Sequence, residues 1–578
     1  NKDAAKRLAK SLLIKLPTST ALINVLGVIS LEQGDIDQAK AYFQEGLAIE
    51  KNHPLKKKNP DLLINLGNVF AARHEHEQAI FNYKAALDLD SSQPDALNNL
   101  AVQFQLAGKN HQALSVLDHI VNEDLKHQDA ASNRAAALVR TGRMKDGLKA
   151  FSDNIKHNPY HHASHSNLCL FSSYSNDVSH SERFAFHKSF GDQFEKEPVT
   201  LTPEQLSLTN NKIRIGYVSP DFNAHSVAYF FEPLLSHHNK DKFEIFCYYN
   251  QTKVDQTTER MMQHADHWRS IVGLSDQALV DLVQKDGIHI LVDLAGHTDK
   301  NNLTAFAYKP APIQVSWLGY PNTTGLTAID YRFTDDIADP VGDSEKFHTE
   351  TLVRLPQGMW CYGGDDSIEP SSTPPCDRNG FITFGSFNNL AKLTPDVVKV
   401  WATILNATPD AKLLLKAKQL IEEETQERLI ELFKDEGIDR DRLTLKAFSA
   451  SKQEHFNLYG EIDLALDTFP FNGATTTCEA VWMGVPVLTI RGDRHVARVG
   501  ASLLHRIGLD ELVAEDKDEY ISKATAYASN LNRLRELRLN MRQRVQSSPL
   551  CDAESFAMSV EQKFQDMWME LLKRPPQQ

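Results

Sequence analysis

Several features that identify common classes of protein are scarce in this 578-residue sequence or missing from it. No stretch approaches the roughly eighteen consecutive apolar residues that a membrane-spanning helix needs. Lys and Arg number 62 against 76 Asp and Glu, so the formal net charge is −14. A nucleic-acid binder instead concentrates positive charge to displace counterions from phosphates. We therefore expect neither a membrane nor nucleic acid among the partners of this chain.

Cysteine is sparse and follows no pattern. The six cysteines lie far apart, without the short repeated spacings of a disulfide framework or a CxxC zinc site. The first ten residues also lack the apolar core of a signal peptide. Both observations favour a reducing compartment, and we interpret the chain as cytoplasmic.

Several catalytic motifs are missing as well. The sequence has no Walker A loop, no GxGxxG after a strand, no HExxH and no clear Asp-x-Asp at a strand end. His161, His165 and Cys169 are spaced four residues apart and could share a helix face as metal ligands. An ordinary helix at the end of a helical region explains the same spacing more simply, so we predict no metal site.

What is present begins with an internal repeat. Asn65, Asn99 and Asn133 stand 34 residues apart, and the turn glycines Gly108 and Gly142 keep the same spacing. This is the period of the tetratricopeptide repeat, a pair of helices that stacks on its neighbours. The pattern predicts an α-solenoid over residues 1–175. Such arrays hold extended peptides or partner surfaces on their concave face.

The first repeat is incomplete. Ala5 falls 34 residues before Ala39, so we expect that the chain opens on the second helix of a repeat and that more repeats precede it. A repeat array also offers a surface through which two copies of the chain could form a homodimer.

After residue 211 short β-branched strands alternate with helical segments. This alternation predicts parallel sheets with crossover helices, as in doubly wound α/β domains. A passage rich in Pro and Ser at 365–380 interrupts the alternation, which then restarts. The predicted strands lie in KIRIGYVSPDF, FEIFCYYN, IHILVDL, PIQVSWLGYP, IDYRFTD and TLVRLP before the interruption, and in FITFGSF, AKLLLK, LTLKAF, EIDLALD and PVLTI after it.

The sequence thus predicts a helical solenoid followed by two Rossmann-like α/β domains. The expected segments are the repeat array (1–175), a linker (176–211), the first α/β domain (212–366), an inter-domain linker (367–380), the second α/β domain (381–552) and a C-terminal helix (553–578).

The segment NGATTTCEAVWMGVP (472–486) follows a predicted strand and opens a helix. Ligands of open α/β sheets bind beyond the carboxyl ends of the strands, and a helix start offers free backbone N–H groups to an anion. Thr475, Thr476 and Thr477 could form such an anion site, with Glu479 one turn further on. A plain threonine N-cap, with Glu479 favoured by the helix dipole, is the alternative, and the residues alone leave both open.

Two other polar residues follow predicted strands. Lys392, in GSFNNLAKLTP (385–395), is placed to reach a phosphate, and His225, in DFNAHSVAYF (221–230), would face the cleft between the domains. A solvated Lys and a structural His are the commoner cases for either residue alone. His289 lies inside a predicted buried strand, where a core histidine is expected.

These motifs, in this order, resemble one known family. The repeats and the runs IRIGYVSPDFNAHSVAYF, DGIHILVDLAGHT, KPAPIQVSWLGYPNTTG, FGSFNNLAK and LDTFPFNGATTTCEAVWMGVP are similar to those of the O-GlcNAc transferase and SPINDLY family, glycosyltransferase family 41. The resemblance covers nearly the whole chain. It implies a metal-independent GT-B fold of two Rossmann-like domains, with a nucleotide sugar held mainly by the C-terminal one.

The resemblance also implies residue roles. Lys392 matches the lysine that neutralises the donor diphosphate, and His225 matches a cleft histidine considered for the acceptor or for base duty. Asp286 and His289 lie in a further motif to which catalytic roles are attributed. The residues that would bind the nucleotide sugar are Asn389 and Lys392, then Lys452 and His455 at the base, Thr475, Thr476 and Thr477 at the diphosphate, and Glu479 at the ribose.

The implied activity is an inverting transfer of a sugar to Ser or Thr hydroxyls of proteins that the repeats present, with no cofactor beyond the donor. We expect the donor to be UDP-GlcNAc. Ala474, Ala391 and Phe471 depart from the animal O-GlcNAc transferases. The segments FGSFNNLAK, GYPNTTGL and TTTCE look instead like SPINDLY, which transfers fucose from GDP-fucose, so protein O-fucosylation is the alternative. A scaffold with an inactive transferase domain, or a transferase acting on a glycan or small molecule, also remains open.

Overall fold

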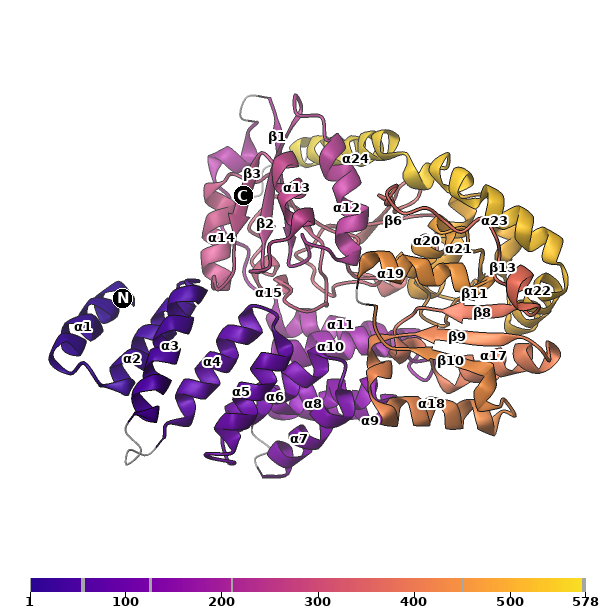
Figure 1. The fold of residues 1–578 in the computed structure, drawn as a ribbon. Helices are drawn as coiled ribbons and strands as arrows, with labels where there is room; N and C mark the ends of the chain where they lie inside the picture. Colours follow the sequence, from indigo (N-terminus) through magenta and orange to yellow (C-terminus); the bar gives the residue numbers. More distant parts are fainter. Residues whose placement is uncertain (1, 53–57, 124–126, 209–210, 450, 574–578) are drawn as a thin grey trace. The chain divides into compact units, whose positions relative to one another are not determined.

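A computed structural model describes residues 2–52, 58–123, 127–208, 211–449 and 451–573 of the chain (Figure 1). The chain divides into two compact units, Asn1–His157 and Asn158–Gln578. Across the described ranges, no helix combines the length and the apolar character that crossing a membrane requires.

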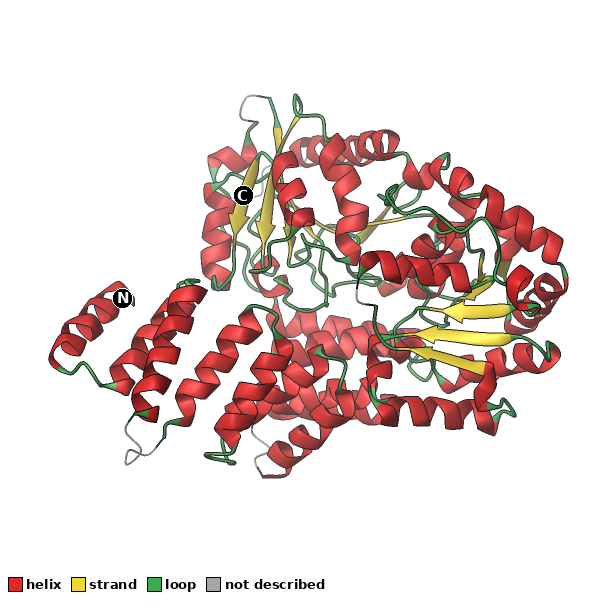
Figure 2. Cartoon of the chain, in the orientation of Figure 1, coloured by secondary structure: helices red, strands yellow, loops and turns green. Residues whose placement is uncertain are grey.

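The first unit consists of paired helices, as Figure 2 shows in red. The pairs α2/α3 and α4/α5 cross closely because a glycine lies at each crossing. A Cβ atom on Gly27 would lie 2.3 Å from the Phe43 ring, and one on Gly67 would lie 2.6 Å from the Tyr83 ring. The helices are α1 (Lys2–Lys15), α2 (Thr20–Glu32), α3 (Ile36–Lys51), α4 (Pro60–Ala72), α5 (His76–Leu87), α6 (Pro94–Leu106), α7 (Asn110–Glu123), α8 (Gln128–Arg140) and α9 (Met144–His157). The predicted solenoid is confirmed.

The second unit begins earlier than the sequence predicts. We expected the array to reach residue 175 and a linker to follow, but α10 (His162–Ser172) and α11 (His180–Phe194) form a helical hairpin that packs within the second unit. Phe190 and Phe194 of α11 share an apolar cluster with Leu291 and Phe306 of the following α/β domain. The hairpin is therefore part of the core of this unit.

Two parallel sheets follow the hairpin, and we call the domains built on them the first lobe and the second lobe. The first sheet has the order β3-β2-β1-β4-β5-β6-β7, and the second has the order β10-β9-β8-β11-β12-β13. Both are doubly wound sheets in which the order reverses beside the first strand, between β1 and β4 and between β8 and β11. Ligands of such sheets bind at the carboxyl ends of the strands at this switch point.

The elements of the first lobe are β1 (Ile213–Ser219), α12 (Ser226–His237), β2 (Phe243–Tyr249), α13 (Gln256–His264), β3 (His267–Ser270), α14 (Asp276–Lys285), β4 (Ile290–Asp293), α15 (Leu303–Phe306), β5 (Ile313–Ser316), β6 (Tyr331–Thr334) and β7 (Thr351–Arg354). Those of the second lobe are α16 (Cys376–Asn379), β8 (Thr383–Ser386), α17 (Pro395–Ala407), β9 (Lys412–Lys416), α18 (Glu423–Asp435), β10 (Leu443–Lys446), α19 (Lys452–Asn457), β11 (Leu464–Leu466), α20 (Thr475–Trp482), β12 (Val487–Ile490), α21 (Val499–Arg506), β13 (Val513–Ala514), α22 (Lys517–Ser529) and α23 (Leu531–Gln546).

The last helix, α24 (Ala553–Lys573), returns from the second lobe to pack against α12 of the first. Glu561 accepts a hydrogen bond from His238 Nδ1 at 2.9 Å, and the Trp568 ring lies 4.7 Å from the His289 ring. The predicted C-terminal helix thus ties the lobes together. Its residues 574–578 lie outside the described part of the chain.

Candidate active site

The threonine run Thr475–Thr477 forms the start of α20, beyond the carboxyl end of β11. Ala474 occupies the N-cap position and makes no side-chain capping hydrogen bond, and the first backbone bond of the helix runs from Cys478 N to Ala474 O at 3.0 Å. A threonine N-cap is therefore excluded. The first turn of a helix has N–H groups without an intrahelical partner, so this helix start can receive an anion.

Lys392 lies beside this helix start. Its Nζ donates to the carbonyl oxygen of Asn472 at 2.8 Å and to Oδ1 of Asn388 at 3.2 Å. Asn388 Oδ1 also accepts from the hydroxyl of Thr476 at 3.3 Å, which links the ammonium to α20. Burial lowers the pKa of Lys392 to about 8. A negatively charged ligand here would therefore stabilise the charged lysine.

The loop between β11 and α20 is held by a buried carboxylate. Asp467 accepts from Gly473 N at 2.7 Å and from the Thr489 hydroxyl at 2.7 Å. Burial raises its pKa to about 6. A Cβ atom on Gly473 would lie only 2.4 Å from Thr476 Oγ1, so the loop passes close to the helix start and needs glycine there.

One turn further along α20, Glu479 belongs to a second polar cluster. Its Oε2 is 3.0 Å from His455 Nε2 and accepts from the Tyr459 hydroxyl at 3.0 Å. Lys416 Nζ contacts the other ring nitrogen, Nδ1, of His455. An ammonium can only donate, so Nδ1 accepts and Nε2 carries the proton that it donates to Glu479. Four residues of helix separate Glu479 from Thr475, a rise of about 6 Å, which a nucleoside diphosphate can span.

Asn389 and Lys452 are less directly placed. The Asn389 side chain is exposed and accepts from Ala391 N at 3.0 Å and from Gln419 Nε2 at 2.9 Å, whereas its neighbour Asn388 contacts Lys392. Lys452 forms an ion pair with Asp365, near the end of the first α/β domain, Nζ to Oδ2 2.7 Å. Neither side chain is directed at the Lys392 cluster in this structure.

In the first lobe, His225 lies just beyond the carboxyl end of β1. It is the N-cap of α12, and its Nδ1 accepts from Val227 N at 3.3 Å. In that state the neutral ring carries its proton on Nε2 and presents a donor. Asp221 Oδ1 is 3.5 Å from Nδ1, so a ring that leaves the cap could instead donate to Asp221 and free Nε2 as a base.

A cavity of about 160 Å³ joins the two lobes. Polar His225 and Thr475 line it together with Lys392, and its apolar wall includes Trp360 and Phe471. A second, larger groove of about 870 Å³ is lined by residues that include Lys452. The structure therefore brings His225 of the first lobe to the diphosphate-type cluster of the second.

Asp286 and His289 lie near the amino end of β4, on the side of the first sheet away from the cleft. Asp286 caps the end of α14 and accepts from both Nε and Nη2 of Arg269 at 3.1 Å and from the Tyr248 hydroxyl at 2.9 Å. His289 precedes β4, is fully buried, and its Nδ1 accepts from Arg214 N at 2.8 Å. The catalytic roles implied for these residues are not supported, because neither reaches the cleft. The expectation of a core histidine at 289 is confirmed.

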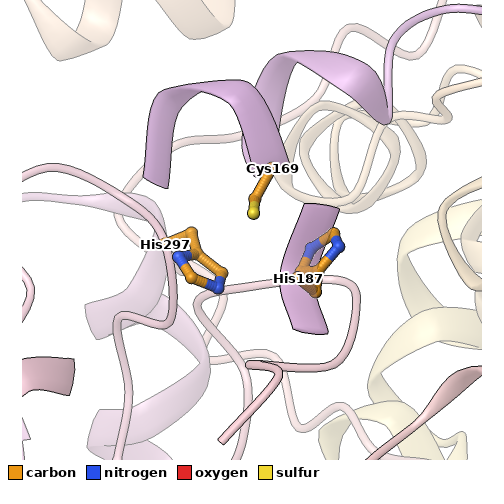
Figure 3. A group of neighbouring side chains, drawn as sticks. All are labelled: Cys169, His187 and His297. Atoms are coloured by element: carbon orange, nitrogen blue, oxygen red, sulfur yellow. The ribbon is translucent and has the colours of Figure 1, made fainter. Parts of the chain in front are cut away.

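The helical metal set considered from the sequence does not form either. Instead Cys169 meets His187 and His297, with ligand atoms within 4.8 Å of one another (Figure 3). Both rings are already bonded. His187 Nδ1 donates to Arg183 O at 2.7 Å, and His297 Nε2 donates to Thr324 O at 2.8 Å.

The remaining nitrogens of the two rings also have partners. His187 Nε2 accepts from the Tyr320 hydroxyl at 2.6 Å, and His297 Nδ1 accepts from the Ser166 hydroxyl at 3.1 Å. Burial lowers the pKa of both histidines, that of His187 to about 3, and raises the pKa of the Cys169 thiol. The cluster is a neutral, satisfied polar core, although among the described residues its three ligand atoms lie close enough together to hold a metal.

Several residues of the candidate site were missed from the sequence. The sequence predicts Asn389 and not its neighbour Asn388 as a site residue, and it does not predict Lys416, Tyr459 or Asp467. A signal existed for two of them, since Lys416 and Asp467 end predicted strands of the second lobe. Tyr459 gave none, because only the fold brings it to Glu479.

Two doubly wound lobes that face one cleft, with an anion-type site at the switch point of the second, define the class of GT-B transferases. The chain belongs to glycosyl transferase family 41, whose family model matches residues 142–367 and 377–560. Two further models, a TPR repeat and a tetratricopeptide repeat, match residues 67–108 and 21–53.

Known relatives agree with this assignment. A probable UDP-N-acetylglucosamine–peptide N-acetylglucosaminyltransferase SPINDLY from Solanum lycopersicum is 40% identical over 411 residues, 70% of this chain and 44% of that protein. A probable UDP-N-acetylglucosamine–peptide N-acetylglucosaminyltransferase SEC from Arabidopsis thaliana is 32% identical over 372 residues, 62% of this chain and 37% of that protein. A solved O-GlcNAc transferase variant from Thermobaculum terrenum superposes with a TM-score of 0.83 at 32% identity, covering 89% of this chain and 98% of the other. The chain spans less than half the length of these plant relatives.

Proposed function

We propose that the chain is an inverting, metal-independent protein O-glycosyltransferase that moves a sugar from a nucleoside diphosphate to Ser or Thr hydroxyls. One observation carries the proposal: Lys392 and the uncapped start of α20 adjoin a cavity that His225 of the other lobe also lines. This arrangement offers a positive site for a leaving diphosphate and room for an attacking hydroxyl.

The main barrier in such a transfer is charge that develops on the leaving diphosphate. Lys392 and the first N–H groups of α20 would stabilise this charge, as preorganised donors do. A bound metal would be redundant in this role, and transfer should proceed in EDTA. The acceptor hydroxyl attacks the anomeric carbon from the face opposite the diphosphate, and inversion follows.

The acceptor proton has two routes. His225 could take it through Nε2 once the ring donates Nδ1–H to Asp221 in place of capping α12. Alternatively, His225 donates Nε2–H to a substrate oxygen, and the proton leaves through the departing phosphate or a water chain. Substitution of His225 by Gln keeps a hydrogen-bond donor but no base, so it separates the two routes.

We propose UDP-GlcNAc as the donor, because the plant relatives are probable UDP-N-acetylglucosamine–peptide transferases and the chain is similar to the solved O-GlcNAc transferase. GDP-fucose is a second candidate because Phe471 and Trp360 give the cavity an apolar wall, which suits the methyl group of a 6-deoxy sugar.

A thermal-shift panel with UDP, GDP, UDP-GlcNAc and GDP-fucose tests both candidates. A ligand at about a hundred times its Kd adds about 2.7 kcal/mol of stability, enough to identify the base. Transfer of label from each nucleotide sugar to protein then identifies the sugar. No response to any of the four compounds would refute the proposed function and favour a scaffold with an inactive transferase domain.

The first unit supports a protein acceptor. Half-buried asparagines link successive repeats, with Asn65 donating to Asn24 Oδ1 at 2.8 Å and Asn133 donating to Asn98 Oδ1 at 2.9 Å. Amide groups of this kind can bind a polypeptide backbone. If they do, deletion of residues 1–157 should abolish transfer to protein while nucleotide binding persists. Unchanged transfer would instead favour a glycan or small-molecule acceptor.

The deletion must end at residue 157. A cut near residue 200 removes α10 and α11, and with them Phe190 and Phe194 from the core of the first lobe. We expect that shorter chain to misfold, so it cannot report on the acceptor.

A further inference from the structure

An aromatic stack connects the helical hairpin to the second lobe. Tyr174 lies in the turn between α10 and α11, and Phe471 lies in the loop between β11 and α20. Their ring centroids are 4.4 Å apart with an interplanar angle of 18°, which is a stacked pair. The proposed chemistry assigns no role to Tyr174, and it uses Phe471 only as part of the apolar wall of the cavity.

The same turn has further contacts with the second lobe. Arg494 Nη2 donates to Ser175 O at 3.4 Å, and His180 Nε2 is 3.1 Å from Asp493 Oδ2. The hairpin turn is thus anchored at several points around Tyr174. Its ring has a fixed place against Phe471 and does not depend on the stack alone.

Phe471 in turn faces the lysine of the candidate diphosphate site. Lys392 Nζ lies 4.5 Å from the centroid of the Phe471 ring, and the next residue, Asn472, accepts from the same Nζ through its carbonyl oxygen at 2.8 Å. Thr468 Oγ1 donates to Phe471 O at 2.7 Å and holds the loop in this conformation. Two successive residues of one loop therefore bind the ammonium.

The face of an aromatic ring attracts a cation and favours its charged form. Burial acts in the opposite direction on Lys392, whose pKa is lowered to about 8. The Phe471 ring therefore works against a loss of charge exactly where a diphosphate requires it to be kept. An aliphatic side chain of similar size would fill the space without this effect.

We propose that Phe471 and Tyr174 are positioning residues that hold the Lys392 ammonium, charged and correctly placed, for the diphosphate of the donor. The proposal rests on the proposed function. Phe471 acts on the ammonium directly, and Tyr174 prevents the Phe471 ring from turning away. The helical hairpin thereby contributes to the donor site of the second lobe.

The test compares Phe471→Leu and Tyr174→Ala with the conservative variants Phe471→Tyr and Tyr174→Phe in the full chain. Affinity for UDP and GDP is measured by calorimetry from pH 6.5 to 9.5. We expect Phe471→Leu to weaken binding of the preferred diphosphate about fivefold at pH 7.5 and to move the alkaline loss of binding about half a pH unit lower. Tyr174→Ala should show the same shift at smaller size, and both conservative variants should bind as the original chain does.

The pH shift distinguishes positioning from space filling, since a merely structural residue would not change the ionisation of Lys392. If Phe471→Leu fails to fold, Phe471→Met gives the same comparison with a more adaptable side chain. Weaker binding with an unchanged pH profile in Phe471→Leu would overturn the positioning role alone. Absence of UDP and GDP binding in the original chain would overturn the proposed function and this inference together.

Discussion

At the switch point of the second lobe, the Lys392 ammonium and the Asn388 amide that accepts from it follow β8, and the Asp467 carboxylate that holds the next loop follows β11. In the first lobe, His225 follows the carboxyl end of β1. The other side chains of this lobe that line the cavity, such as Val227 and Trp360, are largely apolar. The two sheets share one strand order. The fold therefore determines where a ligand can bind, and the residues in the two loops after the strands determine which part of the ligand each lobe can hold.

The amino and carboxyl ends of the strands in the first sheet also differ in how fully their polar side chains are hydrogen-bonded. Asp286 and His289, at the amino edge, have every hydrogen-bonding group engaged by neighbours such as Arg269 and Arg214. At the carboxyl edge, the His225 side chain is 47% exposed and has an alternative partner in Asp221. A polar group available to a substrate is one that the fold leaves incompletely engaged.

The largest effect is expected from Lys392→Ala in the second lobe. Loss of this ammonium should lower turnover about a hundredfold or more, because it removes a preorganised donor to the developing diphosphate charge. The fold should remain, which circular dichroism and thermal melting can check. Lys399→Ala, exposed on α17, is the matched control and should be unaffected. Equal turnover in the two variants would contradict the comparison of the lobes.

A smaller effect is expected from Glu479→Gln. This change keeps the shape of the side chain but removes the charge to which His455 and Tyr459 donate. We expect the KM for the donor to rise about tenfold, as for the loss of a hydrogen bond to a charged group. Glu461→Gln, exposed before β11, serves as the control. An effect on kcat alone would place Glu479 at the reacting bond and not at the nucleoside.

Nucleotide binding by the second lobe should also depend on pH. The pKa of Lys392 is lowered to about 8, so its ammonium is retained below pH 8 and lost above it. Affinity for UDP or GDP should therefore fall above pH 8, by at most about tenfold per pH unit. Calorimetric titration over pH 6.5–9.5 measures this, and Lys392→Ala should abolish the decline. A decline that persists in this variant would assign the titration to another group.

The smallest effect on turnover is expected from Asp286→Asn at the amino edge of the first sheet. The free energy of unfolding should fall by about 1–2 kcal/mol, because the bonds from Arg269 and Tyr248 weaken and the arginine is partly exposed. Turnover at saturating donor should stay within about twofold. Asp281→Asn, exposed on α14, controls for loss of charge. A large loss of turnover without a loss of stability would restore the catalytic role that the family resemblance implied.

Much of the fold followed from the sequence. Hydrophobic periodicity and the 34-residue spacing predicted the solenoid and both parallel sheets. The strands β3 and β13 were missed, since each is a short edge strand with little apolar pattern. α11 was interpreted as a linker although Ser179 and Glu182 form a capping box at its start, a signal that the sequence does contain.

The site was only partly predictable. Residues on one local segment, such as Thr475–Thr477 with Glu479, were brought together by the helix that they form. Asp286 and His289 share a segment too, but the direction of β4 puts them at its amino end, away from the cleft. Asn388 and Asn389 are adjacent, and only the backbone conformation after β8 decides which of them faces Lys392.

By itself the sequence determined the order of elements, the strand ends that meet at a switch point and the helix start at Thr475, because these depend on local periodicity and on the regular geometry of parallel sheets. Only the tertiary structure decided that Cys169 lies beside His187 and His297 and that Tyr174 reaches Phe471, whose ring faces Lys392. These contacts join segments far apart in the chain, and packing between elements, which no local pattern encodes, selects among them.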